Sequence, residues 1–324
     1  MRKAVGLFSG GLDSILAALL VARQGIKVVG IHFLSPFWKK SPHVRKNALK
    51  FGLEFLEVKL PEEYLEIVRS PVYGYGKNCN PCIDCKIFML REAKKVMKEV
   101  GASFVFTGEV VGQRPKSQLF WSLRVIERDS GLEGLLLRPL SAKLLPPTIP
   151  EREGWVDREK LLDISGRSRK IQFKLAEEWG VEDFSSPAGG CLLTDAVFCA
   201  RLRKLMQEKE VFGFQDVELL KLGRHFAISN GFRLVVGRNQ KENQRIMGFY
   251  EEEDMLFLPR DSKGPVGLGK GEPKSGDLRK AASLVARYCD QKEEPLRIKV
   301  LSSEGEFLFL VSALPDEVIA ALRI

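Results

Sequence analysis

Apolar and polar positions follow two different periods along this chain, and each change of period marks a new element. The short apolar run at residues 4–7 predicts a buried strand, and apolar positions then recur at helical spacing over about 12–23, up to Gly25. Residues 27–33 form a second apolar run and predict a second strand. Strand, helix and strand in this order form a βαβ unit, whose strands lie parallel with a right-handed crossover.

The same alternation continues through the first two hundred residues. It predicts helices at about 44–51, 86–100, 171–179 and 194–204, and strands at 53–58 and 102–106. The expected fold class is therefore α/β with a parallel sheet, in which ligands bind at the carboxyl ends of the strands.

From about residue 213 the pattern changes to that of a second domain. Residues 225–229 and 232–236 flank Asn230-Gly231 and predict a β-hairpin. An apolar run at 255–258, a glycine-rich stretch at 264–271 and a helix at 277–288 complete an α+β pattern. We expect a first domain over 1–205, with an insertion at about 141–168, and a second domain over 213–324. A proline-containing insertion of that length is typical of a lid or a docking surface.

The turn at residues 8–14 is the first candidate site. Because it joins a strand to a helix N-terminus, its backbone N–H groups and the helix dipole can hold an anion. Gly10 and Gly11 allow close approach of a phosphate, while Ser9 and Ser14 offer hydroxyl donors. Asp13 suits a magnesium ion that arrives with the phosphate. The alternative is a plain glycine turn without a ligand.

The string Ser-Gly-Gly-Leu-Asp-Ser, residues 9–14, lacks the ending of a Walker A loop and the third glycine of a dinucleotide fingerprint. It resembles the pyrophosphate loop (PP-loop) of enzymes that cleave ATP between its α and β phosphates and adenylate a carbonyl oxygen. The resemblance implies an adenine-nucleotide alpha hydrolase-like fold and binding of ATP with Mg2+. It also makes His32, near the end of the second strand, a candidate adenine neighbour, although an isolated histidine is commonly structural.

Three of the six cysteines have the spacing C-x-x-C-x-x-C, at Cys79, Cys82 and Cys85, just before a predicted helix. A helix N-terminus lowers thiol pKa values, so these thiols are candidates for catalysis or metal binding. The alternatives are a reversible disulfide and a structural zinc site. Cys199 and Cys289 are expected to be buried structural thiols.

The segment 107–113, with Ser117-Gln118 and residues 137–140, resembles the tRNA sulfurtransferases that make 4-thiouridine. The cysteine segment also resembles the tRNA 2-thiouridylases and the iron–sulfur members of that superfamily. The resemblance implies that Gly108 and Glu109 line the nucleotide pocket. It further implies catalytic roles for Cys85 and Cys191, and a [4Fe–4S] cluster held by Cys82, Cys85 and Cys191. In the 4-thiouridine family a lysine before the next helix assists adenylation, and Arg169 and Lys170 occupy that neighbourhood here.

Charge and hydropathy narrow the class of partner. Fifty-one Lys and Arg against forty-two Asp and Glu give a formal net charge of +9, which favours a polyanionic partner. No apolar run reaches the ~18 residues that cross a bilayer, and no signal peptide is evident. We expect a cytoplasmic protein without a membrane partner, in which cysteines are thiols or ligands more often than disulfides.

Gly237-Arg238-Asn239 and the order of elements over about 217–290 resemble the RNA-binding domain of NFACT ribosome-rescue proteins. The basic residues expected to contact RNA phosphates are Arg224, Arg233, Arg238, Lys241, Arg245, Arg260, Lys263 and Lys270. The alternative is a structural cap whose charges face water.

The leading hypothesis is an ATP-dependent tRNA uridine thiolase that makes 4-thiouridine or 2-thiouridine. Its partners would be tRNA and a sulfur donor, either sulfide or a persulfide carrier such as a cysteine desulfurase, with a homodimer as a possible assembly. Two rivals are a small-molecule adenylating amidotransferase or ligase with structural zinc, and a non-catalytic RNA-binding assembly factor.

Overall fold

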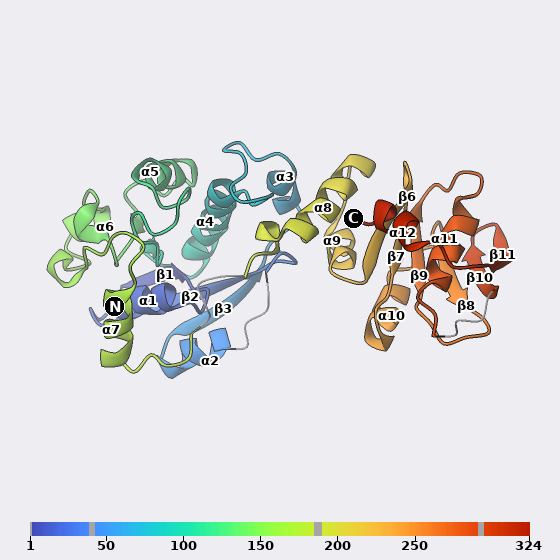
Figure 1. Cartoon of the computed structure of the whole chain (residues 1–324). Coiled ribbons are helices and arrows are strands. Elements are labelled where there is room, and N and C mark those ends of the chain that lie inside the picture. Colours follow the sequence, from blue (N-terminus) through green and yellow to red (C-terminus); the bar gives the residue numbers. More distant parts are fainter. Residues whose placement is uncertain (1, 39–42, 185–189, 291–294) are drawn as a thin grey trace. The chain divides into compact units, whose positions relative to one another are not determined.

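The computed structural model describes residues 2–38, 43–184, 190–290 and 295–324. The chain forms two compact units, Met1–Thr194 and Asp195–Ile324, each with its own β-sheet (Figure 1). Within the described residues, no helix is long and apolar enough to cross a membrane.

The first unit is built on a five-stranded parallel sheet with the order β3-β2-β1-β4-β5. The strands are β1 Lys3–Leu7, β2 Lys27–Leu34, β3 Glu54–Lys59, β4 Phe104–Phe106 and β5 Leu136–Leu137. The chain passes from β1 outward to β3 and then returns to add β4 and β5 on the other side of β1. The order therefore reverses between β1 and β4, and ligands of open α/β sheets bind at such a switch point.

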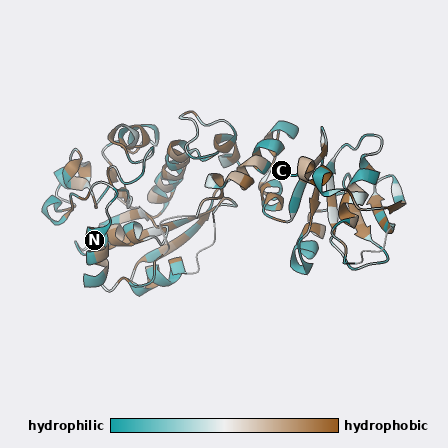
Figure 2. Ribbon diagram, in the orientation of Figure 1, coloured by the Kyte–Doolittle hydropathy of each residue, from teal (hydrophilic) through white to brown (hydrophobic). Residues whose placement is uncertain are grey.

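Helices cover both faces of this sheet. They are α1 Leu12–Ala22, α2 His43–Lys50, α3 Tyr64–Arg69, α4 Cys82–Glu99, α5 Phe120–Asp129, α6 Ile149–Arg152 and α7 Lys170–Glu178. In Figure 1, α4 and α5 lie on one face, and α1, α2 and α7 on the other. The sequence explains the place of α1, since nine of its eleven residues are buried. In Figure 2 this helix is largely hydrophobic, whereas the peripheral α2 is largely hydrophilic.

The predicted α/β class is confirmed, with differences in detail. Helix α4 begins at Cys82, about four residues earlier than predicted, so Cys82 and Cys85 both lie in its first turn. The short helix α3 and the helix α5 were not predicted. The insertion contains α6 and the 3-10 turns η1 Ala142–Leu144 and η2 Arg158–Lys160. Its apolar residues Val156, Leu161 and Ile164 are buried in the same core as α1, so this segment is integrated into the fold. A third 3-10 turn, η3 Leu192–Thr194, ends the unit.

The second unit is a six-stranded antiparallel sheet with the order β11-β10-β8-β9-β7-β6. Its strands are β6 Arg224–Ser229, β7 Phe232–Val236, β8 Met255–Pro259, β9 Gly267–Gly271, β10 Leu296–Ser302 and β11 Gly305–Val311. Its helices are α8 Ala196–Glu208, α9 Phe214–Leu220, α10 Gln240–Met247, α11 Asp277–Ala286 and α12 Asp316–Leu322. The predicted hairpin is confirmed as β6 and β7, and α9, α10, β10, β11 and α12 were not predicted.

Two apolar clusters form in this unit. One contains residues of β7, α11 and β10, and the other contains residues of α9, β9 and α10. The glycines of β9 are required by the first cluster, because a Cβ atom on Gly269 would lie 2.7 Å from the ring of Phe232. The glycine-rich stretch is thus a strand that lets aromatic rings approach its backbone.

Candidate active site

The turn between β1 and α1 has the backbone of an anion-binding loop. Gly10 has a left-handed φ of +74°, a conformation that favours glycine, and Gly11 is the N-cap of α1. No side chain of the described residues caps this helix end, so its first N–H groups face the turn. The Ser14 hydroxyl donates to the Gly11 carbonyl at 2.7 Å, and the Ser9 hydroxyl lies 3.3 Å from that of Ser14. Hydrogen bonds of the Ser9 and Ser14 hydroxyls thus stabilise the turn.

The segment that follows β4 passes directly behind this turn. A Cβ atom on Gly108 would lie 2.5 Å from the backbone carbonyl of Asp13 and 2.6 Å from the backbone nitrogen of Ser14. Only glycine allows that approach without movement of the turn. Gly108 thus joins the ends of β1 and β4 at the switch point.

Asp13 has a partner on each carboxylate oxygen. The Gln113 amide donates to Oδ2 at 2.8 Å, and the Arg169 guanidinium lies 3.3 Å from Oδ1. Gln113 in turn accepts a hydrogen bond of 3.0 Å from the amide of Gln172, which is fully buried in α7. The two side chains next to Asp13 therefore come from the loop after β4 and from the N-cap of α7.

Arg169 is incompletely paired. Its Nε and Nη1 are buried and have no hydrogen-bond partner among the described residues, and the side chain is 13% exposed. Buried donors of a charged group are normally satisfied. Such nitrogens beside an anion-binding turn fit the phosphates of a nucleotide. The exposed Lys170 shows that Arg169 is the member of this pair that faces the site.

His32 lies near the carboxyl end of β2, as predicted. Its Nδ1 is 3.1 Å from the Phe8 carbonyl, and its ring stacks on Phe55 with centroids 6.3 Å apart. A carbonyl can only accept, so Nδ1 is the donor in this contact. The contact with Phe8 ties the histidine to the turn.

Glu109 belongs to a buried ionic network. Its carboxylate accepts a hydrogen bond from the Thr107 hydroxyl at 2.9 Å and lies 3.3 Å from Nε of Arg138. Nη1 of the same arginine is 2.9 Å from the Glu127 carboxylate. The remaining oxygen of Glu109, Oε1, is 3.9 Å from Nζ of Lys86. This geometry makes Glu109 a link between β4, β5 and α4.

Three free thiols gather near one buried tyrosine. Tyr64 of α3 is fully buried, and its hydroxyl donates to the sulfur of Cys85 at 3.1 Å. Burial, together with charges on Cys85, Cys191 and Cys82 that all act on its hydroxyl, raises the pKa of Tyr64 well above its usual value. Cys191 is brought there by backbone pairing with Trp38. Residues 185–189, which precede Cys191 in the chain, lie outside the described residues.

The prediction of lowered thiol pKa values is wrong for this protein. Burial raises the pKa of Cys85 to about 12 and that of Cys191 to about 11, and burial also raises the pKa of Cys82. Desolvation penalises the thiolate more strongly than the helix end and Lys86 favour it.

The remaining cysteines meet the expectation only in part. Cys79 and Cys199 are buried, as predicted for Cys199, but each is disulfide-bonded and does not supply a free thiol. A disulfide depends on the approach of Cβ atoms in the fold, which spacing in the sequence does not reveal. Cys289 is a free, partly buried thiol packed against the core of the second unit.

The donor chemistry of Cys82, Cys85 and Cys191 suits iron or zinc, since thiolates are soft ligands. Within the described residues, however, no group of three or more His, Cys, Asp or Glu side chains is placed to hold a metal ion. The three thiols interact electrostatically without forming a ligand set in this structure.

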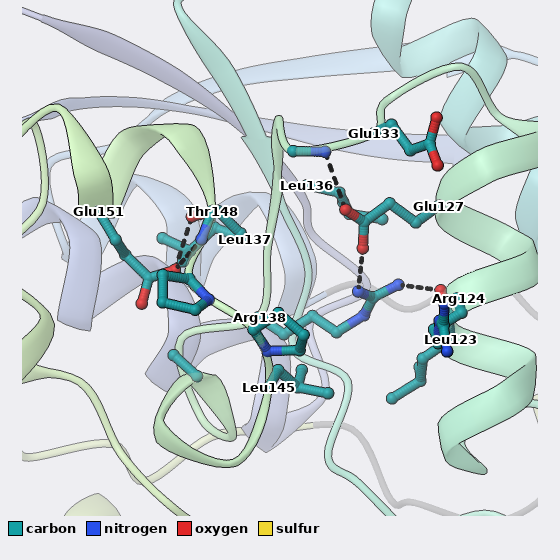
Figure 3. Close-up of a pocket in the computed structure, with 14 residues that line it drawn as sticks. Leu123, Arg124, Glu127, Glu133, Leu136, Leu137, Arg138, Leu145, Thr148 and Glu151 are labelled. Atoms are coloured by element: carbon teal, nitrogen blue, oxygen red, sulfur yellow. Dashed lines mark hydrogen bonds and ion pairs between the residues drawn. The ribbon is translucent and has the colours of Figure 1, made fainter.

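A cavity of about 230 Å³ lies elsewhere in the first unit, between α5, β5 and the insertion (Figure 3). Arg138, Glu127, Thr148 and Glu151 point into it. Glu127 pairs with Arg138, and Thr148 with Glu151. The cavity contains no residue of the turn at 8–14, so it is separate from the phosphate site.

The basic residues predicted to contact RNA have different surroundings in the second unit. Arg238 forms a 2.6 Å ion pair with Glu242, Arg245 is 4.0 Å from Glu218, and Arg224 lies over the ring of Tyr288 at 4.5 Å. Lys241 is exposed. The prediction for Arg233 is wrong, because this side chain is buried beside Glu208 and is unavailable to a phosphate backbone.

Two family models match parts of the chain. Residues 1–143 match the family described as thiamine biosynthesis protein (ThiI), and residues 223–322 match the NFACT protein RNA binding domain. The order of the two matches along the chain is the order of the two resemblances seen in the sequence.

Two curated relatives are similar to parts of this chain. A probable tRNA sulfurtransferase of Thermococcus kodakarensis is 31% identical over 170 residues, which cover 50% of this chain and 40% of the relative. A tRNA sulfurtransferase of Desulfurococcus amylolyticus is 24% identical over 269 residues, which cover 80% of this chain and 48% of the relative. The chain thus spans about half the length of these relatives, or less.

Among solved structures, a 4-thiouridine synthetase in complex with RNA and bound ATP aligns with 68% of this chain and 52% of its own. The identity is 23% and the TM-score 0.40.

Sequence reasoning missed three residues at these sites. Tyr64 lies in a six-residue helix, too short for a periodic signal, and Gln172 looks like any polar residue of an amphipathic helix. Gln113 ends the segment 107–113, but its contact with Asp13 depends on the fold. Only the Arg169-Lys170 pair before α7 gave a usable signal.

Proposed function

We propose that this protein is an ATP-dependent tRNA uridine thiolase. The observation that carries the proposal is the joining of the turn at 9–14 with Gly108 and Arg169 at the switch point of a parallel sheet. The names of the curated relatives and the NFACT-type domain support tRNA as the substrate.

In the proposed reaction, Ser9, Gly10, Gly11 and Ser14 bind the β and γ phosphates of ATP. Asp13 holds the accompanying Mg2+, and Gly108, Glu109 and His32 lie around the nucleotide. A uracil carbonyl oxygen attacks the α phosphorus and releases pyrophosphate. Oxygen then leaves carbon as AMP, a far better leaving group than hydroxide, when sulfur attacks the same carbon.

Cys82, Cys85 and Cys191 are the residues proposed to deliver sulfur. If they hold a [4Fe–4S] cluster, these three thiolates would be its protein ligands, and the cluster would supply soft iron chemistry for a sulfide donor. Without a cluster, Cys191 accepts the outer sulfur of a persulfide donor. Cys85 then attacks the Cys191 sulfur and releases sulfide to the activated uracil carbon, which leaves a Cys85–Cys191 disulfide that a reductant must open. A sulfide or persulfide donor, a cytoplasmic location and a homodimer remain predictions from the sequence.

The direct test incubates the full chain with ATP, Mg2+ and unmodified tRNA under anaerobic conditions, with either sulfide or a persulfide carrier as the sulfur donor. AMP and pyrophosphate should form, and mass spectrometry of the tRNA nucleosides should detect thiouridine and identify position 2 or 4 of uracil. Asp13→Ala should lower pyrophosphate formation by roughly 100-fold or more, whereas the exposed Asp163→Ala should leave it unchanged. Unimpaired pyrophosphate formation by Asp13→Ala would overturn the assignment of the turn.

RNA is also required by the proposal. Adenylation of a small molecule in the absence of tRNA would favour an amidotransferase or ligase instead. Binding of RNA with no nucleotide turnover would favour an assembly factor.

A further inference from the structure

The Asp13 carboxylate is bound in two unequal ways. Oxygen Oδ2 accepts from Gln113 at 2.8 Å, and Gln113 is itself oriented by the buried Gln172 at 3.0 Å. Oxygen Oδ1 faces Arg169 across a longer contact of 3.3 Å. The glutamine relay holds one oxygen rigidly, whereas the other is occupied by a single displaceable cation.

The support beneath the relay is rigid. The loop that carries Gln113 is tied to the segment before α7, because Gly166 donates its backbone N–H to the Val111 carbonyl at 2.8 Å. The position of Asp13 is further constrained by Gly108, which lies against its peptide. We therefore expect the Arg169 side chain to move more readily than Asp13 or Gln113.

Arg169 is the weakly satisfied member of the pair. Of its three guanidinium nitrogens, only Nη2 has a hydrogen-bond partner among the described residues, while Nε and Nη1 are buried without one and the guanidinium lies over the ring of Phe173 at 5.4 Å. A guanidinium presents five N–H donors in a fixed fork that suits phosphate oxygens. In the free protein two guanidinium nitrogens of Arg169 therefore lack a hydrogen-bond acceptor, which a bound phosphate would supply.

We propose that Asp13 and Arg169 form a charge-exchange latch that Mg2+ and ATP open together. In the free protein the pair neutralises both side chains. When nucleotide arrives, Mg2+ replaces Arg169 at Oδ1, and Arg169 turns its unpaired N–H groups to the phosphates. Gln113 and Gln172 are positioning residues that keep Asp13 in place during the exchange. This inference rests on the proposed function, since it takes ATP as the ligand.

The latch makes the metal and Arg169 competitors for one carboxylate. Free ATP without metal can recruit Arg169 only by breaking the pair with Asp13. Removal of the Asp13 charge should therefore release Arg169 and strengthen metal-free binding, while it abolishes the gain in affinity from Mg2+.

The test is a double-mutant cycle of ATP binding, measured by titration calorimetry on the full chain in EDTA and in Mg2+. We expect Asp13→Asn to bind metal-free ATP roughly tenfold more tightly than the wild type, as expected for release of one charge-assisted contact. In an Arg169→Gln background this gain should vanish. Arg169→Lys, which keeps the charge without the fork, should retain part of it.

Simple repulsion between Asp13 and ATP also predicts tighter binding by Asp13→Asn. That gain, however, would persist in Arg169→Gln, and such a result would overturn the latch. Thermal unfolding of each variant verifies that it is folded. A wild-type chain that binds no ATP with or without Mg2+ would instead contradict the proposed function.

Discussion

Gly108 lies against the peptide that joins Asp13 to Ser14, so closely that an added Cβ atom would be 2.5 Å from the Asp13 carbonyl. The added atom would meet backbone atoms of Asp13 and Ser14, and backbone cannot rotate away as the end of a flexible side chain can. The end of β4 thereby determines the position of the whole turn at 8–14.

Gly108→Ala should consequently displace the turn. We expect a loss of about 1–3 kcal/mol in the free energy of unfolding, as for overpacking of a well-packed region, together with loss of ATP binding. Gly11→Ala is the matched control for stability, because its Cβ would meet only the Ser9 hydroxyl at 3.4 Å and Gly11 has a φ of −79°. Urea unfolding compares the two variants. Equal stability of Gly108→Ala and the wild type would show that the turn accommodates the methyl group.

The part of the site that sequence predicts well is local. The turn at 8–14 and helix α1 follow from a contiguous motif and a strong apolar stripe. The partners of Asp13 do not, because Gln113 and Arg169 are 100 and 156 residues away in the chain. Only the packing of α7 decides that Arg169 faces the turn while Lys170 faces water.

The thiol site shows the same limit. The resemblance grouped Cys82, Cys85 and Cys191, and the structure places these three thiols within electrostatic reach of one another. Burial decides their pKa values, however, and burial depends on Tyr64 and the aromatic rings around it. A motif at a helix N-terminus therefore indicated the wrong direction of the shift.

Lys241 and Arg238 offer a test of RNA binding by the second unit. Lys241 is exposed, whereas Arg238 is already neutralised by Glu242 at 2.6 Å. Removal of one cation that binds an RNA phosphate should lower the slope of log affinity against log salt by about 0.7–0.9. Lys241→Gln should therefore reduce the salt slope by about that amount, and Arg238→Gln should reduce it less.

Filter binding of tRNA by the full chain over a series of salt concentrations measures both slopes. An equal reduction in both variants would mean that RNA breaks the Arg238–Glu242 pair. A wild-type affinity that does not depend on salt would identify the second unit as a structural cap.

His225 should make stability depend on pH. It is 2% exposed, and burial, with the nearby positive charges of Arg201 and Arg233, lowers its pKa to about 3. Below about pH 6.5 His225 is protonated in the unfolded chain, whereas it stays neutral in the folded chain. The free energy of unfolding should therefore fall as pH falls from about 6.5 towards 3, by about 1.4 kcal/mol per pH unit from this group.

Urea unfolding followed by far-ultraviolet circular dichroism at pH 7, 6 and 5 measures the effect. His225→Gln retains a donor for the Leu222 carbonyl, which His225 contacts at 2.8 Å, but has no proton to gain. The difference between wild type and variant should amount to about 2 kcal/mol between pH 7 and pH 5. Parallel pH dependence of both proteins would mean that His225 takes up its proton over the same pH range in the folded and the unfolded chain.

The thiols at Cys82, Cys85 and Cys191 separate the two proposed routes of sulfur delivery. Protein prepared without oxygen should be brown and contain about four irons and four sulfides per chain if the three thiolates hold a cluster. Replacement of any one of them by Ala should remove both the cluster and thiolation. Cys289→Ala is the matched control, because this thiol packs against the other core, and the change should cost only modest stability.

Metal analysis, absorption spectra and thiouridine yield are measured on the same anaerobic samples. Stoichiometric zinc without iron, in protein that still thiolates tRNA, would contradict the cluster and favour a persulfide on Cys191. In that case Cys85→Ala should trap the persulfide on Cys191, since the resolving thiol is missing, and mass spectrometry of the Cys191 peptide should detect an added sulfur atom. A chain that thiolates tRNA with neither iron nor an added sulfur would exclude both routes.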